Sequence, residues 1–268
     1  MSGTETVRAR SGRPRSGEAV LSRAFRILRA FRATGERLPL HVLAARAGLP
    51  KSSTSRIAGQ LVDLGALERD DDGNFTVGLH LLEIASLAPR GHGLRTAALP
   101  VMEDLHHVTR QHVLLAVRDG EDGVLIERLS AEDATAVLYR VGGRIPLHQT
   151  GIGVALLMNA PDEIVQASVA RAADPGALRR TLASARSEGV CALTAPNPLP
   201  GGPASISTVA APVVDRLGQG IGAISIVTPS DRAAYVAHKV AVRAAALAIS
   251  RGMAAYGLMR GPAQPDLR

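Results

Sequence analysis

The sequence predicts an α+β protein in which an N-terminal winged helix-turn-helix domain is joined by a helical linker to an antiparallel-sheet domain with flanking helices. Two observations predict this class. Three helical segments and an Asp-Gly hairpin follow one another between residues 18 and 78. Strand-like and helical segments then share residues 93–260, which is typical of an antiparallel sheet with helices on its faces. A chain of 268 residues is long enough to give each part its own core.

Each helix of the first domain has a local signal. Apolar residues from Leu21 to Phe31 recur at helical spacing, with arginines on the opposite side. A second short helix is expected over residues 40–46, and Gly48 then permits a sharp turn. Pro50 suits the first turn of a third helix, because its missing N–H has no partner to lose there.

The segment that opens the third helix carries the features expected of a DNA-recognition helix. Two strands, 66–70 and 74–78, flank an Asp-Gly turn and form the wing that completes the motif. The N-terminal end of such a helix enters a major groove, where hydroxyl groups and cations meet phosphates and base edges. The predicted DNA-binding residues are therefore Lys51, Ser52, Ser53, Thr54 and Arg56. Two alternatives stay open: Ser52 serves only as a helix cap, and Arg56 pairs within the protein.

The distribution of charge favours a nucleic-acid partner for the same domain. Residues 1–56 contain twelve Lys and Arg and three Glu, a net charge of +9, so the remaining 212 residues sum to −2. Double-stranded DNA is the obvious polyanion for such an uneven chain. A solubilising tail alone would explain residues 8–15 and not the structured part that follows.

The composition restricts the other classes of function. Cys191 is the only cysteine, which excludes an internal disulfide and a cysteine-based metal site and fits a cytoplasmic location. No apolar run reaches about 18 residues, so no membrane-spanning helix is expected. Residues 1–17 are basic without a following hydrophobic stretch and are expected to be a disordered arm, not a secretory signal.

The rest of the chain divides into a linker and a second domain. Residues 79–92 are expected to form a short linker helix that Pro89 and Gly91 interrupt. Residues 93–260 follow as the second domain, with two long strands between 205 and 227 and a closing helix. Residues 261–268 are expected to be a disordered tail.

Two separated blocks of sequence resemble the IclR (isocitrate lyase regulator) family of bacterial transcription factors. The first block is Gly48-Leu49-Pro50-Lys51-Ser52-Ser53, with Arg56, Leu61, Leu64-Gly65, Glu68-Arg69 and Phe75-Thr76-Val77-Gly78. The second block is Val141-Gly142, Pro146-Leu147-His148, Gly151 to Leu157, and Ala210-Ala211-Pro212-Val213 through Asp215, Gly220 and Ala223 to Ser225. The resemblance covers residues 18–258.

The resemblance implies a sequence-specific transcriptional regulator whose second domain is GAF-like and binds a small-molecule effector. It also implies a homodimer or tetramer on a palindromic operator in double-stranded DNA. The effector-binding residues carried over from the family are Leu147, Gly151, Ile152, Thr208 and Ser225. Val154 and Val227 replace a family lysine and serine. These replacements indicate an effector less polar than the family's organic acids, or no effector.

No cofactor, metal site or membrane partner is predicted, and no catalytic residues stand out. Gly-rich stretches at 151–153 and 218–222 lack the strand-to-helix context of a dinucleotide site. We expect a regulator in which the effector changes the arrangement of residues 79–92 and so the spacing of two recognition helices. The alternatives are a metabolite-binding protein or enzyme whose winged helix makes protein contacts, and a DNA binder with an orphan sensor domain.

Overall fold

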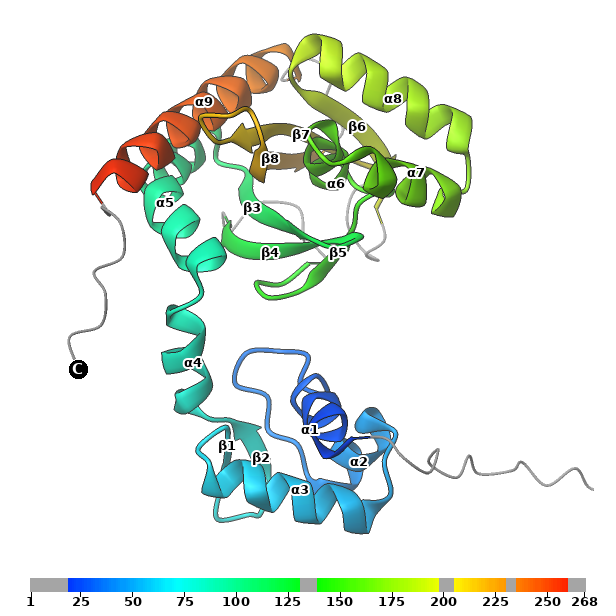
Figure 1. Ribbon diagram of the computed structural model, residues 1–268, viewed down its shortest axis with the longest axis vertical. Helices are drawn as coiled ribbons and strands as arrows, with labels where there is room; N and C mark the ends of the chain where they lie inside the picture. Colours follow the sequence, from blue (N-terminus) through cyan, green and yellow to red (C-terminus); the bar gives the residue numbers. More distant parts are fainter. Residues whose placement is uncertain (1–18, 131–138, 198–204, 230–234, 260–268) are drawn as a thin grey trace, which may run out of the picture. The chain divides into compact units, whose positions relative to one another are not determined.

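The chain divides into two compact units, residues 1–87 and 88–268, and each is described by itself. The computed structural model describes residues 19–130, 139–197, 205–229 and 235–259 (Figure 1). The predicted basic arm and C-terminal tail lie outside the described residues. The division between the units falls between Leu87 and Ala88, inside the segment that the sequence predicts to be a linker.

Unit 1 is a winged helix-turn-helix. Its elements are α1 (Val20–Leu28), α2 (Leu40–Ala47), α3 (Lys51–Asp63), β1 (Leu67–Arg69), β2 (Phe75–Val77) and α4 (Leu79–Ser86). The two strands pair antiparallel as the wing. A single core joins the three helices to the wing, and its largest fully buried side chains are Ile27, Leu43, Ile57 and Leu67. The predicted fold of this half is confirmed.

The turn between α2 and α3 is held by α1. Gly48 ends α2 with φ 62° and ψ 37°, a left-handed conformation that glycine adopts without steric cost. The Arg26 side chain of α1 donates from Nε to the Ala47 carbonyl at 2.9 Å and from Nη2 to the Gly48 carbonyl at 2.7 Å. Bonds from a charged donor are stronger than neutral ones, so this guanidinium fixes the angle at which α3 leaves the turn.

Unit 2 contains a six-stranded antiparallel sheet with helices on both faces (Figure 1). The strand order is β5-β4-β3-β8-β7-β6. The strands are β3 (His112–Asp119), β4 (Asp122–Leu129), β5 (Arg144–Pro146), β6 (Cys191–Pro196), β7 (Ser205–Val214) and β8 (Gly220–Pro229). The helices are α5 (Pro89–Thr109), α6 (Gly151–Met158), α7 (Asp162–Arg171), α8 (Pro175–Glu188) and α9 (Tyr235–Met259).

Two hydrophobic cores lie on opposite faces of the sheet. Val113 and Leu115 of β3 pack in the core with α5 and α9, and Leu114 and Ala116 pack in the core with α6, α7 and α8. This alternation is the period of two expected of a strand, and burial on both sides explains the unbroken apolar run from Val113 to Val117 in β3. The predicted α+β class, with an antiparallel sheet and flanking helices, is confirmed.

The linker differs from the prediction. Only Leu87 and Ala88 separate α4 from α5, and α5 begins at Pro89 with Gly91 inside it. The second domain's first helix therefore starts four residues earlier than expected. Pro89 occupies the first helical position, where it needs no N–H partner, so it starts a helix at the place where a break was expected.

Candidate functional site

The N-terminal half of α3 presents a polar face to solvent. Ile57, Ala58 and Leu61 are buried in the unit 1 core. The opposite side of the same helix exposes Lys51, Ser52, Ser55, Arg56 and Gln60, and Ser53 is half-buried. Polar residues spaced three and four apart share one helix face, so this side of α3 is a continuous polar stripe about two turns long.

Both cations of this stripe are available to a ligand. Lys51 and Arg56 make no hydrogen bond or ion pair within the described residues, and neither does the Ser52 hydroxyl. Pro50 is the residue that precedes the helix, and it makes no side-chain cap. Among the described residues, Ser52 therefore does not cap the helix, and Arg56 has no internal partner.

The prediction that Thr54 binds DNA is wrong. Its side chain is fully buried, and its hydroxyl donates to the Pro50 carbonyl at 3.1 Å. Thr54 precedes Ile57 by three positions, which places both on the buried face of α3. A side chain in that position cannot reach DNA. The sequence-based set of DNA-binding residues did not include Ser55 and Gln60, although both lie on the exposed side of α3 with Ser52 and Arg56.

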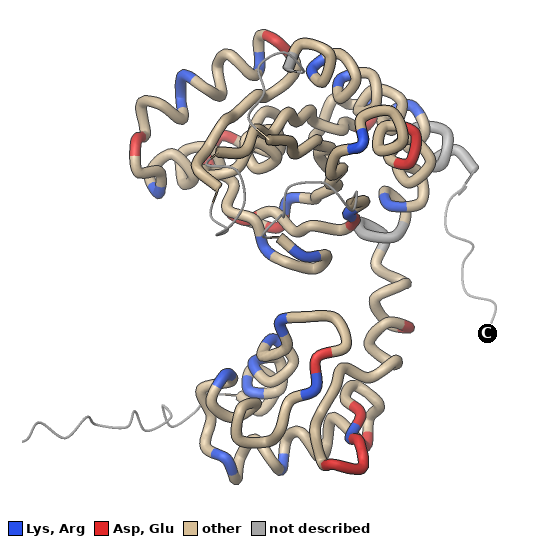
Figure 2. Tube along the Cα trace, turned by 180° about the vertical axis from the view of Figure 1, so that it is seen from behind, with Lys and Arg blue, Asp and Glu red and all other residues tan. Residues whose placement is uncertain are grey.

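The wing has the opposite charge from α3. Figure 2 shows acidic residues gathered at the wing of unit 1 and basic residues along α1 to α3. Asp70 Oδ1 accepts from the Asn74 backbone N–H at 2.8 Å, and this bond holds the pKa of Asp70 below its ordinary value. Asp71 and Asp72 are exposed at the tip. The wing tip therefore repels phosphates, and the attraction for a polyanion lies with the basic residues along α1 to α3.

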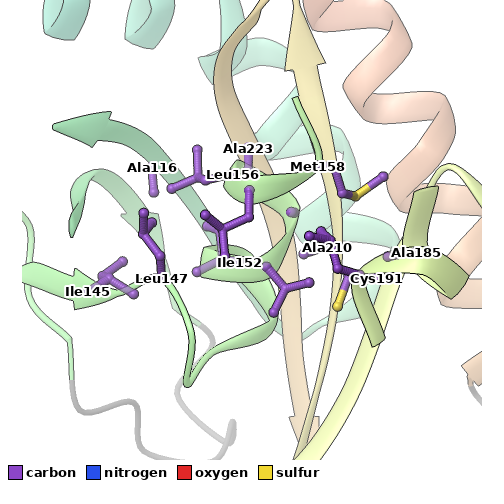
Figure 3. Close-up of a cluster of buried hydrophobic side chains, with 14 of the residues drawn as sticks. Ala116, Ile145, Leu147, Ile152, Leu156, Met158, Ala185, Cys191, Ala210 and Ala223 are labelled. Carbon is purple, nitrogen blue, oxygen red and sulfur yellow. The ribbon is translucent and has the colours of Figure 1, made fainter. Parts of the chain in front are cut away.

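The residues predicted to bind an effector lie together around the start of α6. A Cβ added at Gly151 would lie 2.8 Å from Thr208 Cβ and Cγ2, so only glycine lets α6 approach β7 so closely. The side chains of Leu147 and Ile152 are 0% and 2% exposed and belong to the core drawn in Figure 3. Ser225 is fully buried on β8. Leu147, Ile152 and Ser225 are therefore buried core residues in this structure, and the Ser225 hydroxyl has no hydrogen-bond partner among the described residues.

A cavity of about 340 Å³ opens beside this cluster, between α6, α8 and β6. It is lined by His148, Gln149, Val154, Ala172, Ala173, Asp174, Ala177, Leu178, Thr181 and Leu193. None of the five predicted residues lines it. Two of its residues directly follow Leu147, and Leu193 pairs with Thr208 between β6 and β7. The five predicted residues thus lie next to lining residues of the cavity, but they do not line it themselves.

The polar groups of the cavity are uncharged or already occupied. Burial, together with the positive charge of Arg171, lowers the pKa of His148, which keeps its imidazole neutral near pH 7. Gln149 Nε2 lies 3.0 Å from His148 Nε2. Asp174 Oδ1 accepts from the Ala177 backbone N–H at 2.8 Å and caps α8. A neutral imidazole, an amide and a hydroxyl are left to meet a ligand.

Comparison with known proteins assigns the chain to a family. The sequence model of the IclR helix-turn-helix domain matches residues 20–71. The model described as bacterial transcriptional regulator IclR C-terminal matches residues 88–251. The chain belongs to the IclR family. This family membership makes it a DNA-binding transcriptional regulator with a C-terminal effector-binding domain.

The similar proteins include two curated regulators and one crystal structure. The chain is 30% identical to the HTH-type transcriptional regulator KipR of Bacillus subtilis over 49% of this chain and 53% of that one. It is 27% identical to the HTH-type transcriptional regulator XynR of Escherichia coli over 87% and 96% of the two chains. An IclR homolog from Microbacterium hydrocarbonoxydans, crystallised with 4-hydroxybenzoate, is 32% identical with a TM-score of 0.79, over 88% and 100%.

Other kinds of site find no support in the part of the chain that the structure covers. Among the described residues, no group of three or more His, Cys, Asp or Glu side chains is arranged to hold a metal ion. Within the same ranges, no helix has the length and apolar character needed to span a bilayer. Burial raises the pKa of Cys191 to about 12, so its thiol is protonated and unreactive at neutral pH.

Proposed function

We propose that this IclR-family regulator binds the major groove of double-stranded DNA through the exposed stripe of α3. Lys51 and Arg56 would contact phosphates or guanine edges, and Ser52 and Ser53 would supply hydroxyl groups, with Ser55 and Gln60 added to the set. An amide such as that of Gln60 pairs well with adenine, and a guanidinium with guanine. The regulator acts without catalysis or cofactor, in the cytoplasm where its DNA lies.

One observation carries this proposal. Lys51 and Arg56 are exposed cations with no partner in the described part of the chain, on a helix whose other face is anchored in the unit 1 core. Ordering long cationic side chains at a surface costs entropy, which contact with an anion offsets. The acidic wing leaves the basic helices α1 to α3 as the favoured side of unit 1 for a polyanion.

We propose that two copies bind a palindromic operator, paired through α4. No residue of α4 is buried, and four apolar side chains on it or directly after it are more than half exposed: Leu79, Leu82, Ile84 and Leu87. Exposed apolar surface of this kind marks an interaction site. A second copy suits it, because one recognition helix reads too few base pairs for adequate affinity and a symmetric dimer doubles them.

Substitution of Leu82 tests the dimer. Leu82→Glu places a charge in the proposed interface and is expected to give monomers in sedimentation equilibrium, with unit 1 still folded because Leu82 is outside its core. Glu83→Gln on the same helix is the control and should leave the dimer intact. If Leu82→Glu sediments like the wild type, α4 is not the interface.

We propose that a small organic metabolite is the effector and that it occupies the cavity between α6, α8 and β6. Gly151 and Thr208 act by position, since their close contact sets where α6 begins and therefore where His148 and Gln149 lie. The relative from Microbacterium hydrocarbonoxydans was crystallised with 4-hydroxybenzoate, and the single ring of that molecule is of a size that this cavity admits. Effector binding would shift the arrangement of residues 79–92, at a coupling free energy of about 1–3 kcal/mol.

Footprinting tests the DNA proposal. The protein should protect a palindromic site upstream of its own gene at physiological salt. The double variant Lys51→Ala/Arg56→Gln should lose that protection. Arg180→Gln, which removes an exposed cation from α8, is the control for loss of charge and should protect like the wild type. Equal protection by the double variant would overturn the assignment of α3, and no protection by the wild type would overturn the regulator's proposed DNA contact altogether.

A further inference from the structure

We infer that the cavity between α6, α8 and β6 selects an uncharged single-ring molecule that carries a hydroxyl or amide group, and discriminates against carboxylates. This inference deepens the proposed function and rests on it, because it names the chemical class of the effector that the cavity takes.

The size of the cavity sets the size of the ligand. An apolar cavity of about 150 Å³ is large enough for benzene. The volume here is about 340 Å³, which admits one ring with one or two substituents and lies at the small end of ligand sites. The walls that would contact the ring are the side chains of Val154, Leu178 and Leu193, together with three alanines whose small side chains leave the space open.

The polar groups of the cavity suit a neutral hydroxyl or amide. The neutral imidazole of His148 has one donor and one acceptor nitrogen, and Gln149 Nε2 lies 3.0 Å from its Nε2. The Thr181 hydroxyl makes no hydrogen bond to the described residues, and it both donates and accepts. A ligand hydroxyl can therefore find a donor and an acceptor without any charged partner.

The electrostatics of the cavity oppose an anion. No Lys or Arg belongs to its lining within the described residues. The N-terminus of α8 would ordinarily attract a carboxylate, but the Asp174 side chain already accepts the Ala177 N–H there. Asp174 also brings a negative charge of its own to the edge of the cavity. Arg171, whose positive charge acts on His148, lies outside the lining and is already paired with Glu121 Oε2 at 2.9 Å. An anionic ligand would therefore lose hydration without gaining an unpaired cation, and it would meet the like charge of Asp174.

Two probes that differ in charge and share a ring test this inference. 4-Hydroxybenzyl alcohol and 4-hydroxybenzoate are titrated by calorimetry into the full chain without DNA. The alcohol is expected to bind at least about tenfold more tightly, because the carboxylate would be desolvated without a partner. Thr181→Val should weaken the alcohol by roughly 2- to 12-fold, the range expected for one net hydrogen bond.

Two alanines of α8 give a matched pair of variants. Ala177→Leu fills the cavity and should reduce alcohol binding by at least about tenfold. Ala183→Leu makes the same change on the exposed side of α8 and should leave binding unchanged. Alcohol binding that survives Ala177→Leu would overturn the site, and tighter binding of the benzoate would overturn the preference for a neutral ligand. Failure of both probes to bind at millimolar concentration would overturn the ligand class.

Failure of this inference can be distinguished from failure of the proposed DNA contact. Footprinting of the wild type reports DNA binding without any probe, and calorimetry reports the probes without DNA. Normal protection with no probe binding overturns this inference alone. Probe binding with no protection overturns the proposed DNA contact and leaves the cavity assignment in place.

Discussion

Thr54 and Arg56 lie two positions apart on α3 and face opposite sides of it, so substituting each in turn separates folding from DNA binding. Thr54→Val keeps the shape of the buried side chain and removes the hydroxyl that donates to the Pro50 carbonyl. That carbonyl also accepts the Thr54 backbone N–H at 2.9 Å, so it stays paired after the substitution. The cost is therefore one net hydrogen bond, about 0.5–1.5 kcal/mol.

The expected loss is measurable in a unit of this size. A change of about 1 kcal/mol lowers the melting temperature of a 60- to 100-residue domain by roughly 4–8 °C. Circular dichroism of the full chain should show the unit 1 transition shifted by this amount in Thr54→Val. Arg56→Gln has no partner to lose within the described residues and should melt within about 0.5 kcal/mol of the wild type.

The two variants should rank in the opposite order for DNA affinity: Arg56→Gln should lose more affinity than Thr54→Val. Fluorescence anisotropy of a labelled operator, measured below the melting transition at several salt concentrations, should give Thr54→Val the wild-type affinity. Arg56→Gln should bind more weakly, and its slope of log affinity against log salt should fall by about 0.9 for each phosphate that is no longer neutralised. If Thr54→Val weakens binding as Arg56→Gln does, with its melting temperature unchanged, Thr54 contacts DNA and the assignment of the α3 faces is wrong.

Three further predictions address the wing, the core of unit 2 and its pH dependence. Asp71→Asn/Asp72→Asn removes repulsion at the wing tip, so anisotropy should report a few-fold tighter DNA binding at low salt that vanishes above about 0.5 M salt. Gly153→Ala places a Cβ 2.6 Å from the Leu147 carbonyl oxygen, and thermal melts should show unit 2 destabilised by about 1–3 kcal/mol. Burial lowers the pKa of His238 from 6.5, so the unfolded chain binds a proton more readily, and stability should fall as the pH drops below about 6.5. His238→Gln should flatten that decline in urea titrations, and an unchanged decline would assign it to other groups.

The winged helix could be predicted from sequence because its signals are local. Helical spacing, a glycine turn and an Asp-Gly hairpin each act within a few residues, and the elements formed where these patterns lie. The prediction for Thr54 failed for a different reason. It rested on the hydroxyl composition of residues 51–56 and not on the helical phase, which places residue 54 with Ile57 and away from Arg56.

The cavity could not be predicted in the same way. Its lining comes from the segment before α6, from α6 and α8, from the α7–α8 connection and from β6. No local sequence pattern predicts how α8 packs against the edge of the sheet, or which side of α6 contacts α8. The resemblance pointed to residues 147–152. Leu147, in the segment before α6, and Ile152, on α6, are buried in the core, whereas His148 and Gln149 line the opening.

The position of the cavity within unit 2 constrains how a ligand could act on unit 1. The cavity lies on the α6 to α8 face of the sheet, and α5 packs on the opposite face. Unit 1 is joined through Leu87 and Ala88 to α5, so the covalent route from the cavity to unit 1 crosses the sheet. α6 packs across β7 and β8, and β8 pairs with β3, whose side chains alternate between the two cores. We therefore expect a shift of α6 to repack residues such as Leu114, and the same strand to pass that change to Leu115 beside α5.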